Sequence, residues 1–233
     1  MESGWQKTNV DEGTMGVYVS VPDGGGPFPA VVVLQHRDGV DAFVREMTRR
    51  LAGEGYVAAA PELYHRDGPD CKDDGPTRAQ RLQDANVIKD VNESVRYLQG
   101  HSKVQRERLG IVGFCQGGRG CYLMAGVSSS FKAGVLYYSG NTFTARGDGP
   151  SPFERTKDVH FPLMGHFGEE DENPSPEDVG KIDAELTKYH KAHEFFSYRG
   201  AGHAFMNFEA PSYRGDADKT SWHRTLSFLK KHV

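Results

Sequence analysis

The chain has 233 residues, of which 37% are hydrophobic and 26% are charged, and its formal net charge at pH 7 is -4. This mixture is typical of a globular protein and excludes a disordered chain, while the mild negative charge argues against a nucleic-acid partner or an anionic membrane partner. The length suits one well-covered core, so we expect a single domain over residues 1–233.

The amino-terminal sequence MESGWQKTNV lacks the basic start and the apolar run of a secretory signal. No other run approaches the roughly 20 apolar residues that span a bilayer. Three cysteines, Cys71, Cys115 and Cys121, match neither a disulfide framework nor the paired spacing of a zinc site. We therefore expect a cytoplasmic protein that has no membrane partner and binds no metal.

Seven short segments are predicted strands. Residues 14–21 alternate between apolar and polar side chains, which predicts an antiparallel strand at an edge of the sheet. The six later segments are continuously apolar, which favours strands covered on both faces of a parallel sheet. In chain order they are residues 30–34, 56–60, 109–114, 133–138, 161–166 and 193–198.

Apolar residues recur at helical spacing between most of these strands. Helices are predicted from Val40 to Leu51, from Leu82 to Leu98, after the sequence GFCQGG, from Val179 to Tyr189 and from Trp222 to Leu229. The alternation predicts the α/β class, with an open, doubly wound, mostly parallel sheet that binds ligands at the carboxyl ends of its strands. Segments 62–77 and 139–158, rich in Gly, Pro and Asp, are predicted surface loops at the rim of a site.

The sequence GFCQGG at residues 113–118 follows a predicted strand and precedes a predicted helix. Glycines on both sides of Cys115 allow the sharp turn that holds a nucleophile at a helix N-terminus, where the partial positive charge stabilises a thiolate. A buried, inert cysteine is the alternative, and it is our interpretation of Cys121. A dinucleotide-binding loop is excluded because Leu123 stands where that pattern needs a small residue.

Two further residues follow later strands in the order expected of a nucleophile, an acid and a histidine. Asp171 lies in the loop after residues 161–166, and His203 lies in a Gly-flanked loop after residues 193–198. We prefer Asp171 as the acid over its three neighbours, because a short side chain suits the orientation of a histidine. The neighbours are Glu169, Glu170 and Glu172; a metal site built from His160, His190 and His193 is disfavoured.

These residue types predict acyl transfer. His203 is expected to take the thiol proton of Cys115 and later to protonate the leaving group, with Asp171 holding the imidazole in place. The backbone N–H groups of Gln116 and Arg37 are expected to stabilise the oxyanion. This chemistry needs no cofactor.

The residues above resemble the dienelactone hydrolase family, a cysteine-nucleophile branch of the α/β-hydrolase fold. The resemblance covers nearly the whole chain and is carried by LQHRDGVDAFVREMTRRLAGEGYVAAAPELYHR, GFCQGG, HFGEED and GAGHAF. It implies an α/β-hydrolase fold, a triad of Cys115, His203 and Asp171, and hydrolysis of esters or lactones of the carboxymethylenebutenolidase type.

The chain departs from the family at two positions. His36 stands where the family has a glutamate that helps activate the thiol, and Asn207 stands where it has an arginine that binds the substrate carboxylate. A second family arginine corresponds to Arg78 or Arg81, and the shorter loop leaves that choice open. A protonated His36 would favour the thiolate, while the alternative is an ordinary loop histidine.

Three functions remain open at this point. The first is a thiol-dependent esterase or lactonase acting on a small molecule, with a monomer favoured. The second is a hydrolase of the same fold that acts on an activated phosphotriester. The third is a redox sensor in which Cys115 is reversibly oxidised; the presence of Asp171 and His203 makes it the weakest of the three.

Overall fold

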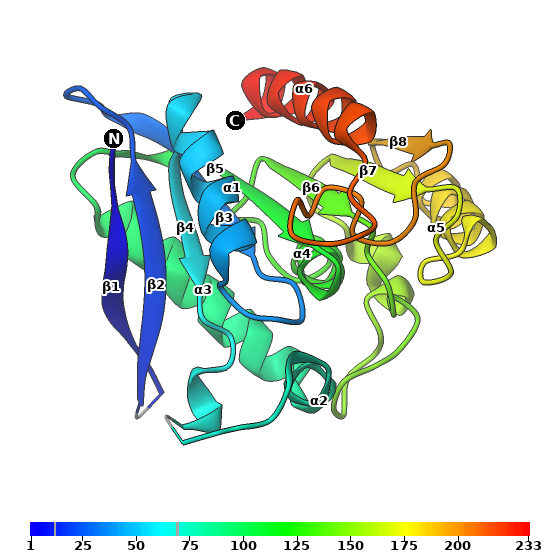
Figure 1. The fold of residues 1–233 in the computed structure, drawn as a ribbon, viewed down its shortest axis with the longest axis horizontal. Coiled ribbons are helices and arrows are strands. Elements are labelled where there is room, and N and C mark those ends of the chain that lie inside the picture. Colours follow the sequence, from blue (N-terminus) through cyan, green and yellow to red (C-terminus); the bar gives the residue numbers. More distant parts are fainter. Residues whose placement is uncertain (12, 69) are drawn as a thin grey trace.

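A mixed eight-stranded sheet runs through the computed structural model, which describes residues 1–11, 13–68 and 70–233 (Figure 1). Its order is β1-β2-β4-β3-β5-β6-β7-β8; β1 and β2 pair antiparallel, and the other six strands are parallel to one another. The predicted mostly parallel α/β fold is therefore confirmed. The strands are β1 (Glu2–Val10), β2 (Gly13–Val21), β3 (Phe28–Leu34), β4 (Val57–Pro61), β5 (Val104–Phe114), β6 (Ala133–Tyr137), β7 (Leu163–Gly168) and β8 (His193–Tyr198).

Helices cover both faces of the sheet. The core on one face contains apolar residues of α1 and α6, and the core on the other face contains those of α3, α4 and α5. Figure 1 shows α1 and α6 in front of the sheet and α3 behind it. Within the described residues, no helix is both long and apolar enough to cross a membrane. The α-helices are α1 (Ala42–Gly53), α2 (Gly75–Arg81), α3 (Asp84–Gly100), α4 (Gln116–Ala125), α5 (Pro176–Lys188) and α6 (Gly215–His232); two 3-10 turns span His65–Asp67 and Phe153–Asp158.

The edge of the sheet differs from the prediction. Residues 14–21 lie in an antiparallel strand, as expected, but β1 forms the edge outside it. Most side chains of β1 are exposed, so its polar sequence has no apolar pattern that would predict a strand. The strand forms because its backbone pairs with β2 along its whole length, from Glu2 opposite Val21 to Val10 opposite Gly13.

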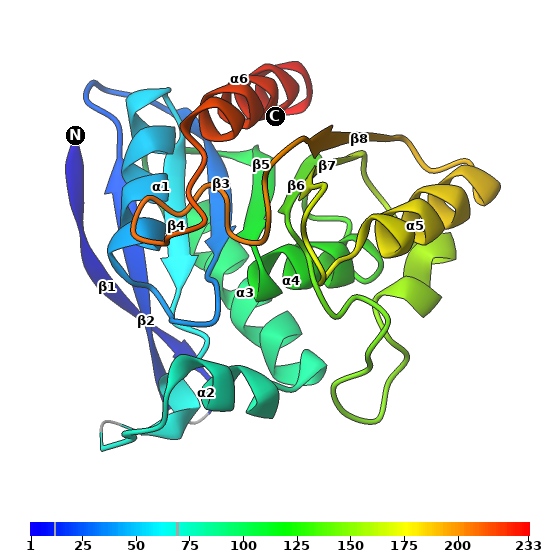
Figure 2. The ribbon, with the colours of Figure 1, turned by 45° about the vertical axis from the view of Figure 1, so that its right-hand side comes forward.

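Part of the predicted loop at residues 62–77 is helical. Helix α2 begins after Asp74, whose side chain accepts a hydrogen bond from the Thr77 N–H at 2.9 Å. The helix is short and buries only Ala79, so it lacks the apolar periodicity that identifies longer helices. In Figure 2, α2 and the loop after β6 lie below the sheet, and they flank the carboxyl ends of the central strands.

Candidate active site

Cys115 occupies the sharp turn between β5 and α4. Its backbone has φ 56° and ψ -117°, a strained conformation that puts the residue at the N-cap of α4. A Cβ added to Gly113 would lie 1.9 Å from the carbonyl oxygen of Gly117, so the turn requires glycine there. The backbone N–H of Cys115 also donates to the Tyr137 carbonyl at 3.0 Å, which ties the turn to β6.

Replacing Gly117 with alanine is expected to destabilise the protein. The new Cβ would lie 2.3 Å from the carbonyl oxygen of Leu34, a backbone atom at the carboxyl end of the central strand β3 that cannot move aside. We expect a loss of about 3 kcal/mol of unfolding free energy in urea denaturation. The matched control is Gly180→Ala on the exposed side of α5, where no atom lies within 4 Å of the new Cβ; it should gain about 0.5–1 kcal/mol. Equal effects at the two positions would contradict this account of the turn.

The structure brings Cys115, His203 and Asp171 together in one chain of contacts, with the imidazole of His203 between the other two side chains. Nε2 of His203 lies 3.0 Å from Sγ of Cys115, and Nδ1 of His203 lies 2.9 Å from Oδ2 of Asp171. The loops that carry the acid and the histidine are joined by a hydrogen bond of 2.9 Å from the Glu170 N–H to the Ala201 carbonyl. The backbone therefore holds the two loops in register, and residues far apart in sequence meet at the carboxyl edge of the sheet.

Asp171 makes the contact with His203, as preferred from the sequence over the neighbouring glutamates. Its carboxylate is buried and also accepts a hydrogen bond of 2.8 Å from the Asn173 N–H, which fixes its direction. Burial alone would lower the pKa of His203. The hydrogen bonds and negative charges of Asp171 and Cys115 outweigh burial and raise the pKa of His203 to about 10.

The side chains of Gln116 and Tyr64 form a clamp that holds the backbone of His36 and Arg37, where the second oxyanion donor was predicted. Nε2 of Gln116 donates to the His36 carbonyl at 3.1 Å and to the Tyr64 hydroxyl at 2.7 Å, and that hydroxyl donates to the Arg37 carbonyl at 2.7 Å. The N–H groups of Gln116 and Arg37 have no hydrogen-bond acceptor among the described residues. Both are therefore free to bind an oxyanion. Tyr64 was missed because nothing in its local sequence marks it.

Two cavities meet at Cys115 and His203. The larger, of about 490 Å³, is lined by α2, by the loops after β6 and β7, and by both of these residues. The smaller, of about 360 Å³, lies toward the loop after β8. Tyr138 lines the smaller cavity and packs edge-on against His203, with ring centroids 5.2 Å apart. The sulfur is thus accessible from two sides, which suits a reaction that separates an acyl group from a leaving group.

His36 and Asn207 both line the smaller cavity. Nε2 of His36 is bound to Oδ2 of Asp41 at 2.7 Å, and Nδ1 lies 3.6 Å from Oδ2 of Asp38. Both ring nitrogens therefore face acids of the same loop, which supports an ordering role rather than thiol activation. Asn207 accepts a hydrogen bond of 3.0 Å from the Glu209 N–H and stabilises its own turn.

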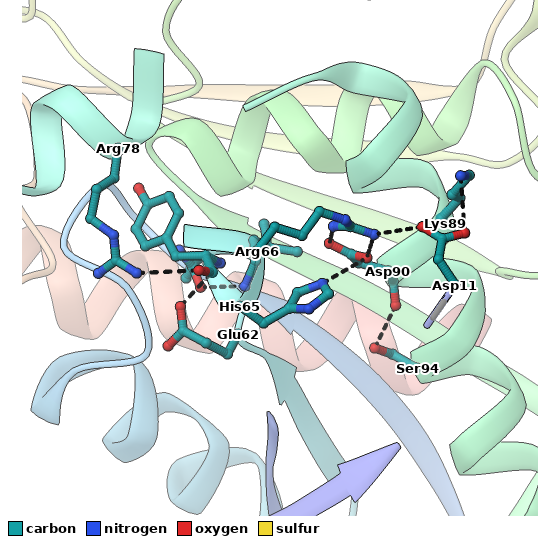
Figure 3. A network of polar contacts seen from close by, with 11 residues as sticks. Asp11, Glu62, His65, Arg66, Arg78, Lys89, Asp90 and Ser94 are labelled. Carbon is teal, nitrogen blue, oxygen red and sulfur yellow. Dashed lines mark hydrogen bonds and ion pairs between the residues drawn. The ribbon is translucent and has the colours of Figure 1, made fainter. Parts of the chain in front are cut away.

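Arg78 and Arg81 lie apart from Cys115. Both pair with Asp67 beside a separate cavity of about 50 Å³, and neither is among the described residues that line the two cavities at the thiol. Figure 3 shows Arg78 beside Glu62 and the segment that follows β4. In the same view Arg66 donates two hydrogen bonds of 2.8 Å to the carboxylate of the fully buried Asp90. These arginines therefore brace the segment that carries Tyr64, and Arg78 and Arg81 line a different cavity from Cys115.

A buried ion pair beside the turn was also missed. Arg119 is 2% exposed and binds both carboxylate oxygens of Asp84, with a distance of 3.0 Å from Nη2 to Oδ2. The sequence does contain a signal for this pair, because Arg119 is the charged residue of a mostly apolar helix. A guanidinium buried by such a helix needs an acidic partner. Within the described residues, no group of three or more His, Cys, Asp and Glu side chains is arranged to hold a metal ion.

A model of the dienelactone hydrolase family matches residues 15–233 of this chain. A Synechocystis sp. protein provisionally assigned as a carboxymethylenebutenolidase is 32% identical, over 93% of this chain and 91% of its own length. A Bradyrhizobium sp. protein provisionally assigned as a 2-oxo-3-(5-oxofuran-2-ylidene)propanoate lactonase is 30% identical, over 96% of this chain and 94% of its own length.

Solved structures agree with these matches. The crystal structure of a provisionally assigned dienelactone hydrolase from Klebsiella pneumoniae superimposes with a TM-score of 0.92 at 31% identity, over 99% of both chains. A dienelactone hydrolase-like promiscuous phosphotriesterase from metagenomic libraries has a TM-score of 0.83 at 18% identity, over 99% of this chain and 98% of its own. At that identity the second likeness supports the shared fold alone.

Proposed function

Because the chain belongs to the dienelactone hydrolase family, we propose that it hydrolyses carboxylic esters or lactones through an acyl-cysteine intermediate on Cys115. A hydrolase of the dienelactone hydrolase type is established by the family match and by relatives that share most of its length. The observation that carries the proposed mechanism is the pair of distances at His203, 3.0 Å to the sulfur and 2.9 Å to the carboxylate of Asp171.

Before the first half-reaction, Nε2 of His203 has taken the proton of the Cys115 thiol, so the reaction starts from a thiolate paired with an imidazolium. The thiolate attacks the carbonyl carbon, a C–S bond forms, and the carbonyl oxygen becomes an oxyanion bound by the N–H groups of Gln116 and Arg37. Collapse of this intermediate breaks the C–O bond. The leaving oxygen takes the proton from His203, and the thioester remains.

The second half-reaction reverses the roles. His203 removes a proton from water, the resulting hydroxide attacks the thioester carbonyl, and the same N–H groups bind the new oxyanion. Breaking the C–S bond releases the carboxylic acid and regenerates the thiolate paired with the protonated imidazole. Asp171 supports both steps because its charge stabilises the imidazolium and its position selects the tautomer.

Acid quenching followed by intact-mass spectrometry tests this proposal. Protein mixed with p-nitrophenyl acetate should gain the mass of one acetyl group, and peptide mapping should place that group on Cys115. Hydroxylamine should remove the acetyl group, since a thioester is cleaved by this nucleophile. Turnover of the ester with the acetyl group on another residue, or with Cys115 fully blocked by iodoacetamide, would contradict the mechanism.

Replacing Tyr64 with phenylalanine is expected to slow acylation about tenfold, because the Arg37 carbonyl loses the hydrogen bond that holds its peptide in place. Stopped-flow release of p-nitrophenol measures this step. Alkylation of Cys115 by iodoacetamide involves no oxyanion and should keep its wild-type rate.

The matched control for this variant is Tyr97→Phe, on α3 and outside the two cavities at the thiol. It should leave both rates unchanged. If Tyr64→Phe slowed alkylation and acylation equally, the hydroxyl would act on the thiol or on the fold, and the clamp would not be its role.

A further inference from the structure

The turn that carries Asp171 rests on the loop after β6. The N–H of Asn173 donates to Oδ1 of Asp171 at 2.8 Å, and the side-chain oxygen of Asn173 accepts a hydrogen bond of 2.9 Å from the Asn141 N–H. A Cβ added to Gly140 would lie 2.7 Å from the carbonyl oxygen of Asn173, so the two loops approach closely at this point. Asn173 therefore contacts the acid on one side and the loop after β6 on the other.

The loop after β6 is in turn anchored by the buried pair of Arg119 and Asp84. Nε of Arg119 donates to the carbonyl of Asn141 at 3.1 Å, and Nη2 donates to the carbonyl of Thr144. Farther along the loop, Arg146 lines the larger cavity. Its N–H donates to Oδ2 of Asp84 at 3.2 Å, and its carbonyl accepts from the Asp84 N–H at 2.8 Å. The pair thus holds the backbone of the loop at Asn141, Thr144 and Arg146.

The burial of Arg119 makes this anchor stiff. Each nitrogen of its guanidinium donates a hydrogen bond, either to the carboxylate of Asp84 or to a carbonyl of the loop. Because a buried guanidinium costs several kcal/mol when its donors are left unpaired, the loop cannot move away without that penalty. Arg119 belongs to the first turn of α4, and its own N–H donates to the Cys115 carbonyl at 3.1 Å. The loop is therefore held at a fixed position relative to the helix that follows Cys115.

We propose that Arg119 is a positioning residue: by fixing the loop after β6 it holds Asn173, and Asn173 holds the carboxylate of Asp171 toward His203. The inference rests on the proposed function, because it matters to catalysis only if Asp171 orients the imidazole. Arg119 is not among the described residues that line the two cavities at the thiol, so it acts through the loop and not on the reacting atoms. Small displacements are enough, since a misplacement of about 1 Å can slow a reaction about 100-fold.

A double variant separates this role from the stability of the ion pair. Arg119→Met alone leaves the buried Asp84 without its partner, which destabilises the fold. Arg119→Met combined with Asp84→Leu removes both charges, and such apolar replacements of a buried pair are often neutral for stability. Urea denaturation should therefore show a double variant close to the wild type, although the carbonyls of Asn141 and Thr144 have lost their donor.

Asn173→Ala interrupts the same path at its other end. This variant removes the side-chain oxygen that binds the Asn141 N–H, and it keeps the backbone N–H that donates to Asp171. The side chain of Asn173 is exposed, so the fold should tolerate its loss. Arg119→Lys completes the set, because it keeps a charge beside Asp84 but lacks the planar fork that reaches the loop as well; its effect should be intermediate.

NMR titration of protein labelled with ¹³C at histidine measures the position of the acid directly. The experiment uses the Cys115→Ala background, and the resonance of His203 is identified by its absence in His203→Gln. The carboxylate of Asp171 stabilises the imidazolium, so a displaced carboxylate lets His203 lose its proton at lower pH. We expect the midpoint to fall by about one pH unit in the double variant and in Asn173→Ala. In Arg119→Met, loss of a positive charge would by itself raise the midpoint, so a fall there reports the displaced carboxylate.

The groups that face His203 are unchanged within this set. Asp171 contacts the imidazole, Tyr138 packs edge-on against it, and position 115 is alanine throughout. The other titratable or charged residues that line the two cavities also stay in place: His36, Arg37, Asp38, Arg146, Glu170 and Glu172. The matched control is Arg50→Met, which removes a guanidinium from a partly buried ion pair between α1 and α6, outside both cavities. It should leave the midpoint of His203 unchanged.

Turnover gives a second measurement in protein that keeps Cys115. We expect kcat for p-nitrophenyl acetate to fall about tenfold in the double variant with KM nearly unchanged, because the loss concerns the alignment of the imidazole and not the binding of the ester. A lowered midpoint would support the role of Arg119 even if the wild-type protein hydrolysed no ester, since the titration does not need the thiol. An unchanged midpoint in the folded double variant or in Asn173→Ala, or an equal fall in Arg50→Met, would overturn the assignment.

Discussion

Replacing Cys115 with alanine is expected to reduce kcat/KM for p-nitrophenyl acetate by about 10⁵-fold, the scale seen when a nucleophile is removed from an intact triad. The substitution leaves His203 and Asp171 in place, but no atom at position 115 can form a covalent bond to the acyl carbon. Residual hydrolysis should come from the oxyanion donors and the imidazole acting on water. Initial rates over a range of ester concentrations measure the effect.

Two variants serve as controls for Cys115→Ala. Cys71→Ser changes another thiol that is not fully buried, outside the cavities, and should retain wild-type activity. Cys115→Ser keeps a nucleophilic atom but replaces sulfur with the more basic oxygen, so its rate should lie between those of the wild type and the alanine variant. Wild-type turnover by Cys115→Ala would remove the nucleophile from the mechanism.

The central fold could be predicted because its strands and helices bury long apolar patterns. Continuous apolarity marked β3 and β4, and helical spacing marked α1 and α3, since these elements face the core directly. Strand β1 and helix α2 contribute little to the core. Their formation depends on pairing with β2 and on a single cap at Asp74, which are tertiary and local details that apolar periodicity does not report.

The three residues proposed for catalysis were predictable because their loops follow parallel strands, and parallel strands end at the same edge of the sheet. Tyr64 and Arg146 reach the same site from long loops whose course the sequence does not determine. The hydrogen bonds of Asp84 and Arg119 place the second of these loops, and both partners lie far from it in the chain. His36 was predictable in position but not in orientation, because Asp41 competes for its ring.

Replacing Asp171 with asparagine is expected to lower kcat by about 10²- to 10⁴-fold with little change in folding. The amide is similar in size to the carboxylate, but its NH₂ group can donate to Nδ1 of His203 and stabilise the wrong tautomer, with the proton on Nε2. The second effect concerns pH. The carboxylate of Asp171 helps to raise the pKa of His203 to about 10, so its loss must lower that pKa.

The pH dependence of kcat/KM shows whether both effects occur. In the wild type, His203 stays protonated at neutral pH and loses its proton as the pH rises through about 10, so the alkaline fall of the rate should lie near that pH. In Asp171→Asn the same fall should begin at lower pH, because a less stabilised imidazolium deprotonates earlier. Glu169→Gln removes a carboxylate from the same loop outside both cavities, and its profile should match that of the wild type. If the pH profile of Asp171→Asn superimposes on that of the wild type after scaling, the carboxylate does not control the proton of His203. The contacts from Asp171 to Cys115 would then have a structural role alone.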